Sequence, residues 1–482
     1  MKKNPHRGLR HPAARLPALL LALLTGLLCF LWLSSGGHRA PSFVPLRSRA
    51  LSDIGALPGA SNLPENSDLP TPAEESGPLI RVLLHTAGYQ GLRHESISVT
   101  SGERFAVYSD GARVDYEAGA VFIPPDGGQA DDMWRIEGAA GLSVKEIVRE
   151  QGCPIYKGSL YIYRMKEGYA VVNELPLEDY VAGVLPGEVP SSFEEEAIRA
   201  QAVCARSYAA CRLGSYAYEE YRAHVDDSTN FQVYGNRSGT EKTKKAARDT
   251  AGEILSYEGE IIATYFFSSS WGSTTDISIW QENPADYPYL PAATLQAERR
   301  STGCSEEAMF RARMNDKDRA VYDADAPFYR WKIRVSADAM SESLNAWLLR
   351  EGYESIGRLC SLSITGRGGG GIATELRAEG EAGFAMLRGQ GIIREALGNA
   401  GWEIQRETDA PVTGWRMLPS AFIYIDEDED AAGNRVFTIV GGGYGHGVGL
   451  SQHGANGMAA RGFHYREILR YFYPGSELKA AD

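Results

Sequence analysis

The sequence predicts an α+β fold in which short antiparallel strands pack with a few helices, as two intimately packed sub-domains. Short alternating stretches punctuated by glycine and aspartate begin near residue 79 and indicate antiparallel strands. A strong helical pattern with small residues on one face follows them. The length of 482 residues allows a core large enough to divide in two.

The N-terminal segment, residues 1–33, predicts a cytoplasmic end followed by an uncleaved signal anchor. The run 16–33 is apolar, has no charged residue and is about long enough to span a bilayer. No A-x-A cleavage site follows it, so we favour an anchor over a removed signal peptide. Residues 34–77 are rich in Pro, Ser, Gly and Ala and predict a flexible extracytoplasmic tether. The basic residues ahead of the apolar run are Lys2, Lys3, Arg7, Arg10 and Arg15.

Composition excludes several classes of protein. Removing the five N-terminal basic charges from the net charge of -13 leaves about -18 on the exported part, which argues against nucleic acid as a partner. The exported cysteines are odd in number and form no C-x-x-C pair, so neither a disulfide framework nor a zinc knuckle is indicated. They are Cys153, Cys204, Cys211, Cys304 and Cys360.

Strands and helices can be assigned in order along the chain. The ranges 80–85, 104–109, 120–124, 160–165 and 169–175 read as antiparallel strands. Farther on, 330–335 and 359–365 predict strands, 337–350 and 391–397 predict helices, and 421–425 with 436–440 predict a strand pair. These later elements form a second α+β portion, about 305–440, within one catalytic region expected to cover 78–476.

The strong helix is preceded by the segment that holds the candidate acid. Ser191 and Ser192 stand three residues before Glu194 and Glu195, the spacing of a capping box. Glu188 lies just ahead, on a Gly-Glu-Val-Pro turn from which a carboxylate can point into a cleft. The small-residue face of the helix, which permits close packing on a sheet, consists of Ile198, Ala202, Ala205 and Ala209.

The most informative segment reads GGGYGHGVGLSQHGANGMAARGFHYREILRYFYPG and covers residues 441–475. Six of the nine residues in 441–449, the glycine strap, are glycine, so the backbone can lie directly against a ligand or another backbone. A helical pattern follows, with Ser451 or Asn456 as the N-cap. If the strap approaches a ligand, Gly447→Val should reduce activity more than stability. The alternative is a tight crossing between packed elements.

These segments resemble the signatures of the stage II sporulation protein D family. The strap and its helix match the family's GHGVGxSQxGAxGMA run and YxxILxxYYPG tail, and residues 173–206 match its PLEDYV, E-[MV]-P and A-x-[KR]-A-Q-A-x-x-A-R signature. Between them, ATYFFSSSWGSTT (263–275) and IWQENPADYPYL (279–290) resemble the family's serine-rich and W-x(n)-YL elements. The resemblance covers about 78–476.

The resemblance implies a lytic transglycosylase that cleaves the MurNAc-β-1,4-GlcNAc bonds of peptidoglycan glycan strands and leaves 1,6-anhydro ends, with Glu188 as the catalytic residue. Ordinary glycosidases need two carboxylates. One is sufficient here, because the C6 hydroxyl of the sugar is the nucleophile and one glutamate can give and then take the proton. Asp226 and Asp227 are possible helpers. The alternative for Glu188 is a solvated or helix-dipole carboxylate.

The resemblance also implies substrate contacts. Arg206 would bind the lactyl carboxylate exposed when the stem peptide is removed from MurNAc, so peptide-free strands would be preferred; pairing with a structural acid is the alternative. His446 would bind the glycan or orient Glu188, or else hold the strap through backbone contacts. We expect His446 and Ser451 or Gln452 within about 10 Å of Glu188, in one groove. The predicted substrate-binding residues are Gln201, Arg206, Tyr234, Ser269, Ser270, Gly272, Tyr444, His446, Gly447, Ser451 and Gln452.

The chain departs from the family pattern at two places. Some members carry a zinc site of histidine and cysteines in the loop after the long helix, whereas here the loop HVDDSTNFQVYGN has His224 and no cysteine. We therefore predict no metal and no other cofactor. Where related sequences often have a histidine, this chain has Phe267.

Family membership sets the biological expectations and their rival. The protein is expected in the mother cell membrane during sporulation engulfment, with its C-terminal region facing the intermembrane space. An amidase, stage II sporulation protein P, is the expected partner. The alternative is a non-catalytic amidase enhancer or peptidoglycan-binding module. A serine hydrolase is disfavoured, because Ser268, Ser269 and Ser270 lack a G-x-S-x-G elbow.

Overall fold

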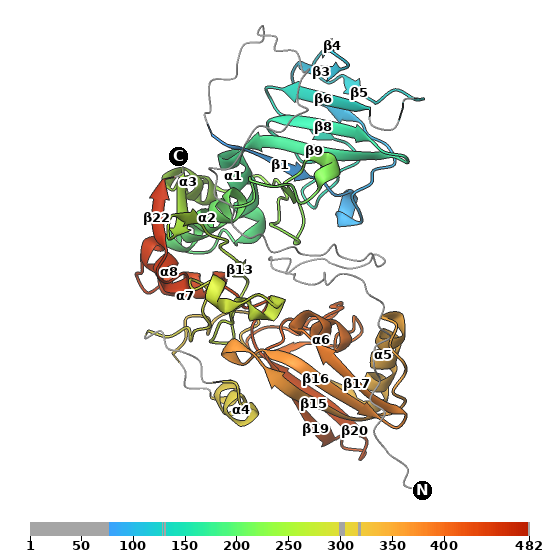
Figure 1. Ribbon diagram of the computed structural model, residues 1–482, viewed down its shortest axis with the longest axis vertical. Coiled ribbons are helices and arrows are strands. Elements are labelled where there is room, and N and C mark those ends of the chain that lie inside the picture. The colour runs from blue at the N-terminus through green and yellow to red at the C-terminus, as the bar shows by residue number, and fades with distance from the viewer. Residues whose placement is uncertain (1–76, 128, 130–131, 298–303, 317–319, 481–482) are drawn as a thin grey trace. The chain divides into compact units, whose positions relative to one another are not determined.

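The computed structural model describes residues 77–127, 129, 132–297, 304–316 and 320–480, which form two compact units (Figure 1). The N-terminal unit runs to Thr264 and includes the final residues from Ser476, and the C-terminal unit runs from Tyr265 to Gly475. The predicted anchor and, apart from Gly77, the tether lie outside the described residues. Within these residues, no helix is both long and apolar enough to cross a membrane.

A seven-stranded sheet is the centre of the N-terminal unit. Its strand order is β10-β1-β9-β8-β6-β3-β4, and every neighbouring pair is antiparallel except β1 with β10. The strands are β1 (Leu79–Leu83), β3 (Phe105–Ser109), β4 (Ala112–Tyr116), β6 (Met133–Gly138), β8 (Ser159–Arg164), β9 (Tyr169–Pro176) and β10 (Val225–Asp226).

Alternation along the strands gives this sheet two packed faces. In β8, Leu160 and Ile162 are buried in the main core of the unit, together with Val171 of β9. The intervening Tyr161 packs on the opposite face with Val172, its partner in the β8–β9 register. The period of two in the sequence therefore sets which residues enter the core.

Two smaller sheets and three helices complete the N-terminal unit. The orders are β5-β2-β7 and β12-β11-β22, so the last strand of the chain, red in Figure 1, pairs with β11. The strands are β2 (Val99–Thr100), β5 (Val121–Phe122), β7 (Ser143–Val144), β11 (Glu253–Tyr257), β12 (Glu260–Ile261) and β22 (Glu477–Ala480). The helices are α1 (Leu177–Glu188), α2 (Glu195–Ala210) and α3 (Glu241–Asp249), with 3-10 turns at Ala87–Tyr89 and Glu219–Tyr221.

The C-terminal unit has three sheets, ordered β18-β14-β20-β19, β15-β16-β17 and β13-β21, of which only the last is a parallel pair. Its strands are β13 (Phe266–Phe267), β14 (Trp331–Ser336), β15 (Leu359–Arg367), β16 (Ala373–Gly380), β17 (Gly383–Arg388), β18 (Gln405–Arg406), β19 (Ile423–Glu429), β20 (Arg435–Gly441) and β21 (Leu450–Ser451). Its helices are α4 (Glu307–Asn315), α5 (Ala337–Arg350), α6 (Gln390–Ala396), α7 (Gln452–Ala459) and α8 (Tyr465–Phe472), with 3-10 turns at Ile277–Trp280, Pro284–Asp286 and Gly369–Gly371.

The predicted α+β class is confirmed, and so are most predicted elements, including α5 and the β19–β20 pair. The capping-box prediction at the start of α2 is wrong. Phe193 N–H bonds to the Pro190 carbonyl, so Ser191 and Ser192 lie in a turn and the helix begins later, with Glu194 as its N-cap. The small-residue face of α2 is buried as predicted.

Candidate functional site

Glu188 is the last residue of α1 and not part of a turn ahead of a helix. The residues Leu177–Glu188 are helical although Pro186 and Gly187 stand in the final turn, which is why the sequence pattern favoured a turn. The helix ends at Val189, whose extended backbone forms the C-cap. The side chain of Glu188 is buried, and its Oε1 accepts a hydrogen bond of 2.7 Å from the Val233 N–H.

Glycines in α1 allow the segment around Val233 to approach the helix closely. A Cβ on Gly187 would lie 2.6 Å from the Val233 carbonyl oxygen, and one on Gly183 would lie 2.6 Å from the Tyr234 ring. Tyr234 donates from its hydroxyl to Asn173 Oδ1 at 2.9 Å. Tyr234 is thus a buried packing residue that helps hold this segment, and its face is not open for stacking on a sugar.

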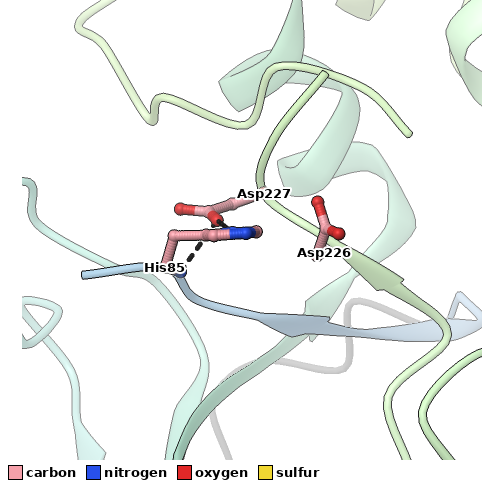
Figure 2. Close-up of side chains that lie close together, drawn as sticks. All are labelled: His85, Asp226 and Asp227. Carbon is pink, nitrogen blue, oxygen red and sulfur yellow. Dashed lines mark hydrogen bonds and ion pairs between the residues drawn. The ribbon is translucent and has the colours of Figure 1, made fainter. Parts of the chain in front are cut away.

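Upstream in the same loop, two adjacent buried aspartates fix the chain. Asp226 accepts hydrogen bonds from Ser228, Tyr218 and Asn230. Asp227 accepts from the backbone and ring of His85 and pairs with Arg149, and Figure 2 shows the His85–Asp227 contact with Asp226 beside it. The aspartates named as possible helpers of Glu188 therefore form a hydrogen-bonded cluster with His85.

The residue types in this cluster are ones that bind metal ions, since ligand atoms of His85, Asp226 and Asp227 lie within 4.8 Å of one another. All four carboxylate oxygens, however, already accept protein hydrogen bonds. The Arg149 guanidinium lies 2.6 Å from Asp227 and supplies positive charge where a cation would. His224, the one histidine of the loop considered for zinc, accepts the Arg81 N–H through Nδ1. These donor sets do not fit a zinc site, and we assign no metal.

Arg206 is a buried structural residue. Its Nε and Nη2 both lie 2.7 Å from the Glu178 carboxylate, and the guanidinium also donates to the carbonyls of Glu253 and Ala247. The side chain is fully buried. These contacts favour pairing with a structural acid over binding of a lactyl carboxylate. That acid is Glu178, in the first turn of α1.

Gln201 differs from Arg206 in its hydrogen bonding. The residue is 1% exposed, and neither its amide nitrogen nor its amide oxygen has a hydrogen-bond partner among the described residues. A buried amide without partners is costly, so such a group commonly meets a ligand or a water molecule. Of the predicted binding residues in the N-terminal unit, Gln201 is the one whose side-chain nitrogen and oxygen have no hydrogen-bond partner among the described residues.

The predicted residues of the C-terminal unit do come together. The serine-rich segment and the glycine strap form mutual backbone bonds, with Ser269 and Tyr444 exchanging both of theirs and Thr275 donating to the Gly447 carbonyl. Phe267 lies opposite Ser451 in the parallel β13–β21 pair. The residues gathered there are Ser269, Ser270, Gly272, Tyr444, His446, Gly447, Ser451 and Gln452, all of them buried.

His446 holds the strap in place. Its Nε2 lies 2.9 Å from the Phe266 carbonyl oxygen, and its Nδ1 accepts the Val448 N–H at 3.0 Å. The rings of Trp280 and Phe267 lie 5.0 and 5.7 Å away. Burial lowers the pKa of His446 to about 3, so the imidazole is neutral at physiological pH. These contacts favour the alternative in which His446 holds the strap through hydrogen bonds to the backbone.

The structure also identifies a buried acid that the sequence did not reveal. Asp323 Oδ2 accepts from the Ser270 N–H at 2.5 Å and from the Ser451 hydroxyl at 2.9 Å, while its Oδ1 has no hydrogen-bond partner within the part of the chain that the structure describes. Burial raises the pKa of Asp323 to about 6. Ser451 in turn caps α7 by accepting the Gly454 N–H. Asp323 stands in a plain acidic stretch, VYDADAP, so no motif marks it.

The candidate residues thus form two groups. Glu188, Gln201, Arg206 and Tyr234 belong to the N-terminal unit, and the serine-rich and strap residues belong to the C-terminal unit. The expectation that His446 and Ser451 or Gln452 lie within about 10 Å of Glu188 stays a prediction.

We predict that Arg206→Gln destabilises the protein by about 1–3 kcal/mol, because it removes the buried donor to the Glu253 and Ala247 carbonyls and the ion pair with the partly exposed Glu178. Arg199→Gln on the same helix is the control, since its ion pairs with Glu195 and Asp249 are exposed and worth at most about 1 kcal/mol. Urea unfolding measures both. A variant at position 206 as stable as wild type would restore a binding role for Arg206.

The immediate neighbours of Gly447 predict a loss of stability on substitution. A Cβ at Gly447 would lie 2.7 Å from the Phe422 ring, in a backbone with φ of +83°. We predict that Gly447→Ala loses about 1–3 kcal/mol more stability than Gly462→Ala, which shares the positive φ but faces open space. Thermal unfolding of both variants is the measurement, and equal losses would contradict it.

Comparisons with known proteins agree with the sequence signatures. A family model described as stage II sporulation protein, SpoIID, matches residues 165–257, and a model for a domain of unknown function matches residues 277–449. The first match contains Glu188, Gln201, Arg206 and Tyr234. The second contains the glycine strap, residues 441–449, and begins just after the serine-rich segment.

Three curated proteins are similar over most of the described chain. The amidase enhancer of Bacillus subtilis is 30% identical over 306 residues, 61% of this chain and 40% of its own length. Stage II sporulation protein D of the same organism is 28% identical over 327 residues, 64% of this chain and 76% of its own. An uncharacterised protein of Brachyspira hyodysenteriae is 29% identical over 359 residues, 71% and 81% of the two chains. The alignment thus spans about two fifths of the amidase enhancer.

Proposed function

Because this chain belongs to the stage II sporulation protein D family, we propose that it acts on peptidoglycan during sporulation, as a lytic transglycosylase that cuts MurNAc-β-1,4-GlcNAc bonds. The observation that carries the proposal is Glu188, a buried carboxyl group within the family-model match, fixed at the end of α1 by a backbone donor. A general acid held at one place is the group that this reaction requires.

In the proposed reaction, Glu188 gives its proton to the glycosidic oxygen as the bond to C1 of MurNAc breaks. The resulting carboxylate then accepts the proton of the C6 hydroxyl while O6 bonds to C1, which closes the 1,6-anhydro ring. No water enters and the enzyme ends in its starting protonation state. The Val233 N–H supports this cycle, because a hydrogen bond from a backbone amide stabilises the carboxylate formed midway.

Substrate binding in this proposal involves Gln201, whose open amide can donate to one sugar hydroxyl and accept from another. Arg206 takes no part, because its guanidinium is occupied by Glu178. The preference for peptide-free strands therefore stays a prediction without a residue to explain it.

The alternative function is that of an amidase enhancer, which the 30% identity to the Bacillus subtilis protein of that name favours. In that case the chain would raise the activity of an amidase without cutting glycan itself. We further propose the location that the N-terminal sequence predicts, a signal anchor in the mother cell membrane with an amidase partner, stage II sporulation protein P, on the same side as the C-terminal region.

We predict that Glu188→Gln reduces glycan cleavage by about 10²- to 10⁴-fold, because the amide cannot give or take the proton. Release of soluble fragments from purified, peptide-free glycan strands is the measurement, with the melting temperature as the check on folding. Glu195→Gln is the matched control: its carboxylate is exposed in the first turn of α2 and should be dispensable.

Activity of the Glu188 variant within tenfold of wild type would remove Glu188 from the catalytic role. If wild-type protein releases nothing alone but raises the rate of an added amidase, and Glu188→Gln does the same, the enhancer function replaces the proposed one.

A further inference from the structure

The segment 226–233 connects the His85 cluster to the carboxyl group of Glu188. Beyond β10 it forms no helix or strand and consists of bends and turns. At one end, the Asp227 N–H bonds to the Leu83 carbonyl of β1, and at the other end the Val233 N–H bonds to Glu188. Because the segment lacks a repeating backbone ladder, its side-chain contacts decide where Val233 lies.

Asp227 is the residue of this segment that pairs with basic side chains, those of His85 and Arg149. Its Oδ1 accepts from the His85 N–H at 2.9 Å and lies 2.8 Å from His85 Nδ1, while its Oδ2 lies 2.6 Å from Arg149 Nη2. Figure 2 shows the His85 ring, two residues beyond the end of β1, lying beside the Asp227 carboxylate. Arg149 also donates to the His85 and Thr86 carbonyls, so β1, Arg149 and the segment form one network.

Among the described residues, Asp227 is the member of the segment that hydrogen-bonds to a histidine. Asp226 accepts only from the uncharged donors Ser228, Tyr218 and Asn230. Gln232 is held by the Tyr180 hydroxyl. The ionisable groups that surround the His85 ring are Asp226, Asp227 and Arg149, with the Tyr89 ring 5.9 Å away.

The charges of this network set the pH range in which it is strongest. Burial alone would lower the pKa of His85, but the hydrogen bond and charge of Asp227 outweigh burial and raise it above 6.5. Burial would raise the pKa of Asp227, but Arg149 and His85 outweigh it and lower that pKa below 3.8. The His85⁺–Asp227⁻ contact is therefore complete below pH 6.5 and weakens as the pH rises through the folded pKa of His85.

We propose that His85 and Asp227 position Glu188 through the segment 226–233, and that loss of the His85 proton loosens this positioning and slows the reaction. The proposal rests on the proposed role of Glu188. Neither residue needs to touch the substrate: they are positioning residues that fix the N–H which Glu188 accepts. A displacement of about 1 Å at a catalytic group can cost roughly 100-fold in rate, so a modest loosening is measurable.

A test that does not depend on activity uses NMR of the full chain labelled with ¹³Cε1-histidine and ¹⁵N-valine. The pH midpoint of His85 should lie above 6.5, and the Val233 amide resonance should move with the same midpoint. In His85→Asn the amide nitrogen keeps the bond that Nδ1 makes to Asp227 but does not titrate, so Val233 should stop moving in this range. If Val233 is unmoved while His85 titrates in wild type, the proposal fails.

The kinetic test compares pH profiles on peptide-free glycan strands. In wild type, kcat should fall as the pH rises through the midpoint of His85, while KM stays nearly constant. In His85→Asn, kcat should stay high and should not fall in this pH range. His85→Leu, which removes the bond, should lower kcat about 10- to 100-fold at every pH. His224→Asn is the matched control, because burial lowers the pKa of that histidine to about 4 and its Nδ1 is only an acceptor.

The two tests separate failure of this inference from failure of the proposed function. A coupled His85 and Val233 titration in a protein without glycan cleavage would leave the network standing and overturn the activity. Cleavage by a folded His85→Leu variant at the wild-type kcat and pH profile would overturn the network and leave the activity standing.

Discussion

The hydrogen bond from the Val233 N–H to Glu188 is the contact on which the candidate site of the N-terminal unit depends. Two glycines of α1 let the loop approach the helix, and Tyr234 and Gln232 fix the loop on either side of Val233. At its far end the loop is tied to β1 through Asp227. The buried carboxyl group of Glu188 is thereby held by a loop that forms no helix or strand. Side chains far from Glu188, such as Asp227, therefore help to determine where its hydrogen-bond donor lies.

The C-terminal unit uses its glycine strap differently from what its sequence suggests. The glycines allow close approach, but what approaches is protein: Phe422 at Gly447, Phe267 at Gly445 and the Tyr265 carbonyl at Gly449. His446 is neutral and bonded to backbone on both ring nitrogens. The strap and the serine-rich segment therefore form a packed core in this unit. Asp323, buried with one oxygen unbonded, is the least expected group within it.

Much of the fold could be predicted from the sequence, because local periodicity determines it. The bounds of α5 and the presence of the β19–β20 pair follow from apolar spacing, although β19 extends to Glu429, four residues beyond the predicted end. Helix α1 was missed because Pro186 and Gly187 read as a turn, whereas tertiary contacts keep its last turn helical. The late start of α2 depends on a turn bond at Pro190 that no capping motif shows.

The candidate site was only partly predictable, for a different reason. The signature located Glu188 and Gln201, but it could not tell that Arg206 pairs with Glu178, since their contact joins two helices. His85 and Arg149 carried no motif, and they matter only because the sheet brings them to Asp227. Contacts between residues far apart in the chain are set by the topology of the fold, and a single sequence does not reveal them.

Mass spectrometry of the ends of peptide-free glycan strands, after incubation with the purified full chain, tests the central claim most directly. A lytic transglycosylase with Glu188 as its acid and base predicts new strands that end in 1,6-anhydroMurNAc and carry no oxygen from labelled water. Strands with labelled reducing ends would indicate hydrolysis instead. Strands of unchanged length, with an added amidase accelerated, would contradict the account and assign the chain to the enhancers.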